Sequence, residues 1–257
     1  MSGGVELEQR ARTALADAWE AEGLLRESHG GTSADLRDIR LMASGLPHAQ
    51  WNSAQVTGPH PDIPGARAFY GERRLPWGIR LPVGMACTHG RFVVRLRLMA
   101  LRAPRFQPVQ AFAGLDVAMA GQDELESVVA VDAAAFGVDP EVDRLWVEPH
   151  LGAAEVETAI AAIDGQAVAT AYTVRTDARA GPALYVGGVA VAAQARRRGV
   201  AAAMTSWLLR RGLAGGAELA HLHADSEASR GVFRRLGFEE AGELDVYEIE
   251  DRAYAEP

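Results

Sequence analysis

The chain has 257 residues, of which 48% are hydrophobic and 23% are charged, and its formal net charge at pH 7 is -8. This composition predicts a globular protein with enough residues for two small domains, and it excludes a disordered chain. The negative charge disfavours nucleic acid as a general partner, because the phosphate backbone is itself negative. All 26 basic residues are arginine, which excludes a lysine nucleophile or Schiff base.

The first hundred residues predict a long helix followed by short strands around a second helix. Apolar residues recur at helical spacing from Val5 to about Arg26, which predicts an amphipathic helix, and residues 29–33 predict a turn. We expect strands at 39–44, 50–57, 77–81 and 91–101, the last as one strand or a bent pair, and a helix at 66–73.

Residues 103–108 are the best linker candidate, so we expect an N-terminal α/β domain over 1–107 and a second domain over 108–257. The second domain begins with a strand at 115–119 and helices at 122–136 and 140–151. Asp164-Gly165 between two apolar runs predicts a hairpin of strands 156–163 and 166–176. Later elements are predicted at 185–191 (strand), 199–212 (helix, stopped by Gly212), 218–223 (strand), 226–236 (helix), and 238 onward and 244–249 (two strands).

The cysteine count and the apolar runs limit the cofactors and the cellular location. The single Cys87 excludes an intramolecular disulfide and a cysteine-rich metal site, and we expect a buried or loop thiol within residues 84–89. We expect no metal. The first ten residues contain acidic side chains and no apolar core, and no apolar run reaches the ~20 residues of a membrane helix. We therefore expect a cytoplasmic protein without membrane partners.

Residues 185–207 combine a strand, a turn and the start of a helix. Val200, Met204 and Leu208 fall on one helix face, so the helix begins directly after the arginine run 196–198. The first turn of a helix has free backbone N–H groups and the positive end of the helix dipole. Because Gly199, Ala201 and Ala202 are small, a phosphate can approach the main chain closely there.

Two segments together resemble a known family. Residues 196–201, R-R-R-G-V-A, resemble the R/Q-x-x-G-x-G/A signature of the GNAT superfamily of acyl-CoA-dependent N-acyltransferases, although Ala193 stands where proline is common. Residues 226–238 are similar to the family's later helix, N-x-x-A-x-x-L-Y-x-x-x-G-F. The resemblance covers about 109–250, and the first hundred residues look similar to the eroded N-terminal half of a tandem GNAT protein.

The resemblance implies an α+β fold, with a mixed, mostly antiparallel sheet flanked by helices that lies C-terminal to a smaller, degenerate GNAT-like α/β half. It also implies acetyl-CoA as the cofactor and a primary amine of a small molecule or peptide as the acceptor. The strand before the turn would hold the pantetheine arm and polarise the carbonyl, and the turn would hold the pyrophosphate. The cofactor-binding residues implied are Val189, Ala190, Val191, Arg196, Arg197, Arg198, Gly199, Val200, Ala201, Ala202, Ser226 and Phe233.

Departures from the family pattern leave the proton donor open. Ser226 replaces the common asparagine, and Phe233 replaces the tyrosine that protonates the leaving thiolate, which rules out a tyrosine acid at that position. His223 (paired with His221 on one side of its strand), Tyr185 and Ser226 are the candidate catalytic residues. Each has a structural alternative: a neutral, hydrogen-bonded histidine, an ordinary strand tyrosine, and for Phe233 a core residue.

The strand 185–191 contains no glutamate, so a base there is missing and deprotonation through water is the fallback. Gly187 and Gly188 give room beside a thioester, and a structural β-bulge explains them equally well. The main expectation is acetyl transfer by a monomer or homodimer. The alternative is an acyl-CoA-binding sensor or regulatory module with a GNAT fold and no turnover. A P-loop or Rossmann nucleotide protein is disfavoured, since the sequence has neither glycine signature.

Overall fold

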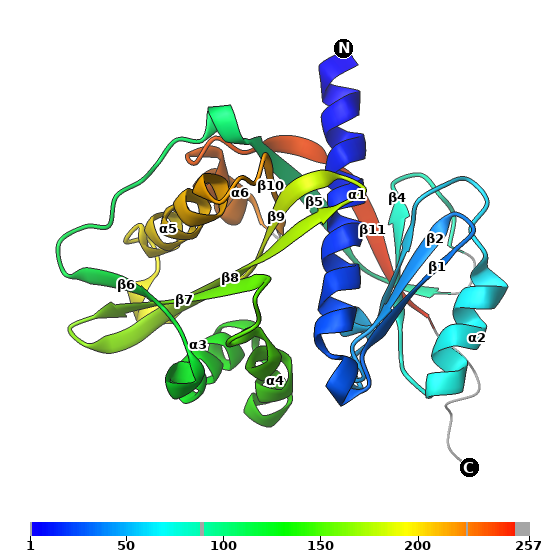
Figure 1. The fold of residues 1–257 in the computed structure, drawn as a ribbon, viewed down its shortest axis with the longest axis horizontal. Coiled ribbons are helices and arrows are strands. Elements are labelled where there is room, and N and C mark those ends of the chain that lie inside the picture. The colour runs from blue at the N-terminus through cyan, green and yellow to red at the C-terminus, as the bar shows by residue number, and fades with distance from the viewer. Residues whose placement is uncertain (1, 88–89, 225, 250–257) are drawn as a thin grey trace. The chain divides into compact units, whose positions relative to one another are not determined.

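The computed structural model describes residues 2–87, 90–224 and 226–249 and divides the chain into two compact units (Figure 1). Unit 1 comprises Met1–Ala18 and Met99–Ala241, and unit 2 comprises Trp19–Leu98 and Gly242–Pro257. Three elements contribute residues to both units: α1 (Ser2–Leu25), β5 (Gly90–Arg102) and β11 (Glu239–Ile249). The units are therefore drawn from separated segments, and the division into 1–107 and 108–257 stays a prediction.

Unit 1 has the strand order β5-β10-β9-β8-β7-β6, and the neighbours from β9 to β6 are antiparallel while β9 and β10 are parallel. Helices α3 and α4 lie on one face of these strands, and α5 and α6 lie on the other (Figure 1). Its elements are β6 (Leu115–Met119), α3 (Leu125–Phe136), α4 (Pro140–Val147), β7 (Val156–Ile163), β8 (Gln166–Ala178), β9 (Gly181–Val191), α5 (Val200–Ala214), β10 (Leu219–Ala224) and α6 (Glu227–Arg234). This mixed, mostly antiparallel sheet flanked by helices confirms the predicted α+β fold.

The local signals in unit 1 explain most of these bounds. Asp164 and Gly165 both have positive φ (52° and 75°), as the predicted hairpin turn requires. The prediction that Gly212 ends a helix is wrong, because α5 continues to Ala214. A Cβ on Gly212 would lie 2.4 Å from Leu184 Cδ2, so this glycine permits close packing of helix on strand. The two strands predicted after residue 238 are one strand, β11, with Gly242 at φ 93°.

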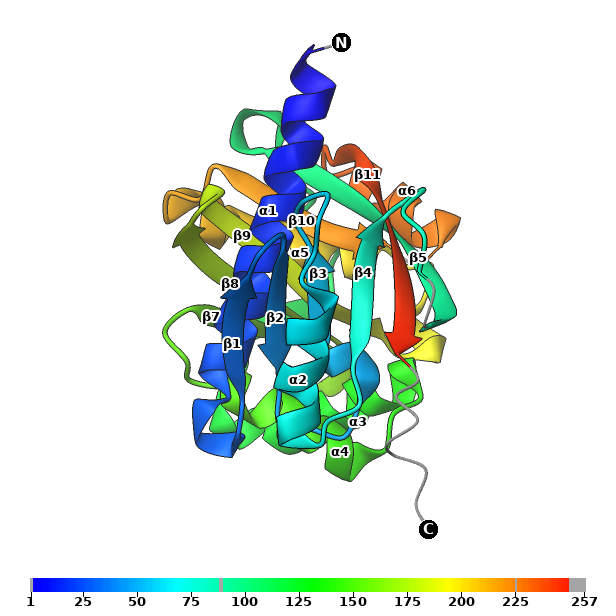
Figure 2. The ribbon, with the colours of Figure 1, turned by 90° about the vertical axis from the view of Figure 1, so that its right-hand side faces the viewer.

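Unit 2 has the strand order β1-β2-β3-β4-β11, with α2 over one face (Figure 2). Its further elements are β1 (Thr32–Leu36), β2 (Ile39–Ala43), β3 (Ser53–Val56), α2 (Ile63–Arg73) and β4 (Gly78–Pro82). The sequence does not predict β1, because its five residues are largely polar. In the structure none of them is buried. In the core, the ring of Tyr70 stacks on Trp77 with centroids 4.7 Å apart. Residues 91–101 form one strand, β5, and not a bent pair.

Two apolar clusters of unit 1 fix the helices on the sheet. One joins α5 to β7 and β8 through residues such as Val200, Met204 and Leu208, which are the apolar residues predicted to share a helix face. The other joins α5, α6 and β10, and it contains Phe233. None of the helices in the described chain is both long and apolar enough to cross a bilayer.

Candidate functional site

Strand β9 has a β-bulge at its two glycines. The register with β8 moves from Thr170↔Ala190 to Tyr172↔Gly187, so β9 uses one residue more than β8. A Cβ on Gly187 would lie 2.6 Å from Tyr172 Cζ, and one on Gly188 would lie 2.8 Å from Tyr172 Cδ1. Gly188 also has φ 57°. The structural alternative for this glycine pair, a bulge, therefore describes the strand, and a side chain is excluded at both positions.

Beyond the bulge, β9 leaves its parallel neighbour. Among the described residues, the pairing with β10 runs from Ala183↔Leu219 to Tyr185↔His221 and ends there. Both strands continue, β9 to Val191 and β10 to Ala224. After the bulge, Ala190 and Val191 pair with Thr170 and Ala169 of β8 on one side, and no described strand pairs with the other edge of residues 189–191. Such an edge can bond an extended ligand through backbone N–H and C=O groups.

The predicted anion-binding turn follows this edge directly. Gly199 is the N-cap of α5 at φ 86°, and the first helical bond of the cap joins Ala203 N–H to Gly199 O at 3.0 Å. The backbone N–H groups of Val200, Ala201 and Ala202 belong to the open first turn. No atom lies within 4 Å of a Cβ placed on Gly199, so the approach to the turn is open. The turn fits a phosphate or pyrophosphate.

The arginine run around this turn is exposed and keeps its charge free. Arg196 Nε donates to the carbonyl oxygen of Val191 at 3.0 Å, and the guanidinium of Arg198 lies 5.7 Å from the ring centroid of Phe112. No ion pair links Arg196, Arg197 or Arg198 to an acidic residue within the described segments. Several arginines elsewhere in the unit are paired with acidic residues, for example Arg211 with Glu157 at 2.9 Å. The charge of the run is therefore free to attract a polyanion.

Aromatic and histidine rings gather below the bulge. The ring centroids of His221 and His223 lie 5.5 and 6.1 Å from that of Tyr185, which confirms that both histidines point to one side of β10. Tyr172 lies 6.2 Å from Tyr185, and His150 stacks on Tyr172 at 4.3 Å. We call these five residues the ring cluster.

His221 is a deeply buried member of the ring cluster, 2% exposed. Burial, and to a lesser extent the neighbouring His223, lowers the pKa of His221 to about 3, so this imidazole is neutral at neutral pH. Its Nε2 atom is buried and has no hydrogen-bond partner within the described part of the chain. His221 thus presents one unsatisfied polar atom beside Tyr185.

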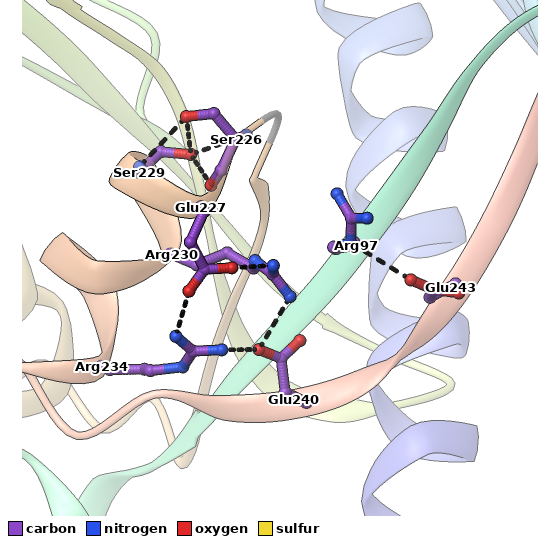
Figure 3. Close-up of polar contacts among 8 residues, drawn as sticks. All are labelled: Arg97, Ser226, Glu227, Ser229, Arg230, Arg234, Glu240 and Glu243. Atoms are coloured by element: carbon purple, nitrogen blue, oxygen red, sulfur yellow. Dashed lines mark hydrogen bonds and ion pairs between the residues drawn. The ribbon is translucent and has the colours of Figure 1, made fainter.

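The other two predicted residues lie on α6. The hydroxyl of Ser226 caps the helix: its Oγ accepts from the backbone N–H of Ser229 at 3.2 Å (Figure 3). The same helix is held by Glu227, which pairs with Arg230 and Arg234 (Figure 3). These contacts give Ser226 a structural role, and no contact within the described residues joins it to the ring cluster.

Phe233 is 5% exposed and packs edge to face on Phe238, with centroids 5.9 Å apart. The core alternative therefore describes the place of this ring, and its contact with a cofactor stays a prediction.

The structure also brings together two carboxyl groups that were not among the predicted site residues. Asp132 of α3 and Asp143 of α4 are 8% and 1% exposed, and their side chains are hydrogen bonded to each other. Asp132 Oδ1 accepts from Thr170 Oγ1 at 3.1 Å and lies 3.7 Å from a Cβ placed on Gly188. The available signal was an aspartate four residues after Val128, on the face of the helix that the apolar residues occupy.

Burial raises the pKa of Asp132 to about 8 and, together with it, that of Asp143 to about 6. The repulsion between the two carboxylates adds to the effect of burial at Asp132. The pair as a whole therefore holds one proton near neutral pH, shared between two oxygens, and carries one negative charge.

Metal and thiol sites are not part of this arrangement. No group of three or more His, Cys, Asp or Glu side chains in the described chain is placed to hold a metal ion. Cys87 is a half-buried free thiol, and its predicted neighbours Thr88 and His89 lie outside the described residues. A hollow of about 360 Å³ lies over α5 beside Trp207, Arg210 and Arg211, and none of the predicted site residues lines it.

Comparison with known proteins agrees with this geometry. Residues 116–241 match the family model of the acetyltransferase (GNAT) domain. A GCN5-related N-acetyltransferase from Kribbella flavida superposes with a TM-score of 0.70 at 21% identity, covering 95% of this chain and 97% of its own. A putative GNAT-family acetyltransferase from Novosphingobium aromaticivorans superposes at 0.58, with 18% identity and coverage of 91% and 97%.

A tandem GNAT protein from the clavulanic acid biosynthesis pathway superposes at 0.56, with 16% identity and coverage of 86% and 80%. A sequence search of curated proteins found no match. Residues 116–241, just under half of the chain, therefore match the GNAT acetyltransferase domain, and their fold agrees with that match. The fold of the whole chain, with its first hundred residues included, has counterparts among GNAT proteins.

Proposed function

We propose that the protein is an N-acetyltransferase that moves the acetyl group of acetyl-CoA directly to a primary amine of a small molecule or peptide. The observation that carries the proposal is that two features of unit 1 follow each other along the chain. The free edge of β9 at residues 189–191 leads within a few residues to the open first turn of α5 with its exposed arginines. An extended chain ending in a pyrophosphate is the ligand that matches both features.

Each part of the turn and the strand has a role in this proposal. The N–H groups from Arg197 through Ala202 would bind the pyrophosphate, and the charges of Arg196, Arg197 and Arg198 would add to that attraction. The main chain of Val189, Ala190 and Val191 would bond the amides of the pantetheine arm. Acetyl-CoA supplies an activated acyl carbon and a thiolate leaving group. A backbone N–H at this edge would stabilise the negative charge that develops on the acyl oxygen.

For the proton that the leaving thiolate needs, Tyr185 and His223 are the proposed donors. Both lie in the ring cluster next to the bulge, whereas Ser226 already uses its hydroxyl in the helix cap. His221 is neutral and buried, so it would orient Tyr185 and His223 and not act as an acid itself.

The second candidate function is a sensor that binds acyl-CoA without turnover. The observation that favours it is Phe233, a core ring at the position where the family's tyrosine acid stands. Turnover of any amine well above hydrolysis would remove this alternative.

Thermal unfolding with and without acetyl-CoA tests the proposal. A ligand at about 100 times its Kd stabilises the folded state by roughly 2.7 kcal/mol, which is a large shift for a protein of this size. We expect the wild type to show this shift, and then to release free thiol when a panel of primary amines is added. No shift at millimolar acetyl-CoA would overturn both the enzyme and the sensor. A shift without thiol release from any amine would favour the sensor.

A further inference from the structure

The buried carboxyl pair Asp132–Asp143 lies where the two helices of one sheet face meet the bulge of β9. Helix α3 packs on β8 and β9, and Thr170 of β8 hydrogen bonds to Asp132. The distance of 3.7 Å from Asp132 Oδ1 to a Cβ on Gly188 is an ordinary van der Waals contact. Since Gly188 has no side chain, the carboxyl group faces the backbone of the bulge directly. This backbone immediately precedes residues 189–191, the free strand edge.

The pair is not fully satisfied by the protein. Asp143 is 1% exposed, and apart from the proton that the pair shares, no donor in the described residues reaches its Oδ2 atom. A buried carboxyl oxygen without a donor is costly, and two apolar side chains would fill this space at lower free energy. Native proteins keep few such atoms, and each calls for an explanation. A ligand that gives its proton to the pair through Asp132 is such an explanation.

The ring cluster also lies at the bulge. A Cβ on Gly187 would lie within 2.8 Å of the rings of both Tyr172 and Tyr185, so both rings close over this glycine. Tyr185 contacts His221, whose Nε2 is the second buried polar atom without a partner. Aromatic rings and a carboxyl pair at the same bulge form an environment that suits a cation carrying N–H donors.

We propose that Asp132, positioned by Asp143, receives the protonated primary amine of the acceptor at the Gly187–Gly188 bulge and takes its proton, while Tyr172 and Tyr185 hold the cation. This inference rests on the proposed acetyl transfer and adds the substrate class: an acceptor that enters as an ammonium ion and not as an alcohol. It also supplies the base that the strand 185–191 lacks. Asp132 is the residue that contacts the substrate, and Asp143 acts through it.

The proposed transfer balances in protons and bonds. One proton passes from the ammonium group to the carboxyl pair and leaves a neutral amine. The amine nitrogen bonds to the acyl carbon while the carbon–sulfur bond breaks, and a second nitrogen-bound proton goes to the thiolate through the ring cluster. The pair returns its proton to solvent when the amide product and the free thiol leave.

Few other charges act on the pair. Asp143 of α4 is the one charged group that perturbs Asp132 within the described chain. The titratable groups near the bulge on the other packed elements are those of the ring cluster. They are Tyr172 on β8, Tyr185 on β9, His221 and His223 on β10, and His150, which follows α4 and stacks on Tyr172. The ammonium site therefore depends on the negative charge of the pair, and it weakens in acid as the second proton binds.

Asp132→Asn tests the inference with little change of shape. The amide can donate to Asp143 and accept from Thr170, so the fold is expected to persist, but the group no longer accepts a proton. Asp17→Asn is the matched control, because Asp17 is also buried in unit 1 (2% exposed) and accepts a hydrogen bond. Its donor is the N–H of Ala180 at 2.9 Å, seven residues before Gly187. Asp143→Asn tests how Asp143 positions Asp132, separately from the contact between Asp132 and the substrate.

We expect Asp132→Asn to keep the acetyl-CoA-induced thermal shift and to lose on the order of 10²–10⁴-fold in kcat with an amine, the usual contribution of a general base. Asp143→Asn should lose less and should move the pH profile of kcat/KM. Asp17→Asn should keep the rate. An Asp132→Asn variant with wild-type kcat would overturn the inference and leave the proposed function intact. A wild type without an acetyl-CoA shift would overturn the proposed function by itself.

A second readout does not require turnover. Thermal unfolding is compared in n-butylammonium chloride and in an equal concentration of tetramethylammonium chloride, which has the same charge and no N–H donor. The wild type should be stabilised more by n-butylammonium, and Asp132→Asn should show no difference between the two salts. Equal responses of wild type and variant, or no difference in the wild type, would overturn the inference even where no amine of the panel is acetylated.

Discussion

Each unit contains two parallel strands joined by a helix, and the two helix starts differ in how their backbone donors are used. In unit 1 the motif is β9-α5-β10, and in unit 2 it is β3-α2-β4. Helix α5 begins at Gly199 with an open turn and free arginines. Helix α2 begins at Asp62, whose carboxylate accepts the N–H of Gly65 at 3.0 Å, and Pro64 in its first turn has no N–H to offer.

The strands before these helices differ in the same sense. Strand β3 has four buried residues, and three of them, 53–55, pair with β4 in continuous register. Strand β9 is bulged and leaves β10 after Tyr185. A parallel pair joined by a helix therefore does not make an anion site by itself. The helix start must keep its donors free, and in unit 2 an acidic N-cap already satisfies one of them. This difference supports placing the proposed cofactor site in unit 1 alone.

The largest expected effect comes from reversing the charge at the open turn. The double variant Arg197→Glu/Arg198→Glu should abolish the acetyl-CoA-induced shift of about 2.7 kcal/mol at 100 times the wild-type Kd, because two carboxylates would repel the pyrophosphate. Arg235→Glu is the control, since Arg235 is an exposed arginine on the same unit after α6. If the double variant keeps the shift measured by thermal unfolding, the assignment of the turn fails.

The second largest expected effect is a loss of stability that comes from strain at the bulge. Gly188→Ala should lower the free energy of unfolding by about 1–3 kcal/mol, because Gly188 has φ 57° and the new Cβ meets the ring of Tyr172. Gly231→Ala on α6 should instead raise it by about 0.5–1 kcal/mol, since no atom lies within 4 Å of the new Cβ. Urea unfolding of both variants measures the contrast, and equal values would show that the bulge is not rigid.

The carboxyl pair predicts a pH dependence of stability. Asp132 keeps its proton to about pH 8 in the folded chain and loses it near 3.8 when unfolded, so unfolding releases a proton and stability falls as pH rises through this window. Below pH 6.5, His221 has the opposite effect, because it gains a proton only on unfolding. Between about pH 6.5 and 8 the pair should dominate.

In that range the free energy of unfolding should fall by at most about 1.4 kcal/mol per pH unit, the value for one proton. Asp132→Asn should flatten this slope. Denaturant titrations at several pH values give the slopes, and a slope that Asp132→Asn leaves unchanged would contradict the shared proton.

The smallest expected effect concerns unit 2. Asp62→Ala removes the cap of α2 and should cost about 1 kcal/mol of stability, while the response to acetyl-CoA stays that of the wild type. Thermal unfolding in the presence and absence of acetyl-CoA measures both quantities. A weaker acetyl-CoA response in Asp62→Ala would contradict the contrast between the two helix starts, because it would show that the start of α2 contributes to ligand binding.

The amino-acid sequence alone determined the features that depend on near neighbours. The hairpin at Asp164-Gly165 and the start of α5 after Gly199 are each set by a few consecutive residues, and most predicted elements appear within a few residues of their bounds. The two GNAT-like segments were readable for the same reason. Helix-start donors and strand glycines act through the local backbone, so spacing along the chain preserves them.

Only the tertiary structure decided what distant residues do together. The local sequence around Gly212 is typical of a helix stop, but in the structure this glycine allows α5 to pack closely on Leu184. Strand β1 is largely polar, so it has no apolar pattern that predicts a strand. Asp132 and Asp143 lie on two helices, and neither carries a motif. Their shared proton, and their contact with the bulge at Gly188, arise because packing α3 and α4 on the sheet removes both carboxyl groups from water. Burial of that kind is a property of the assembled fold.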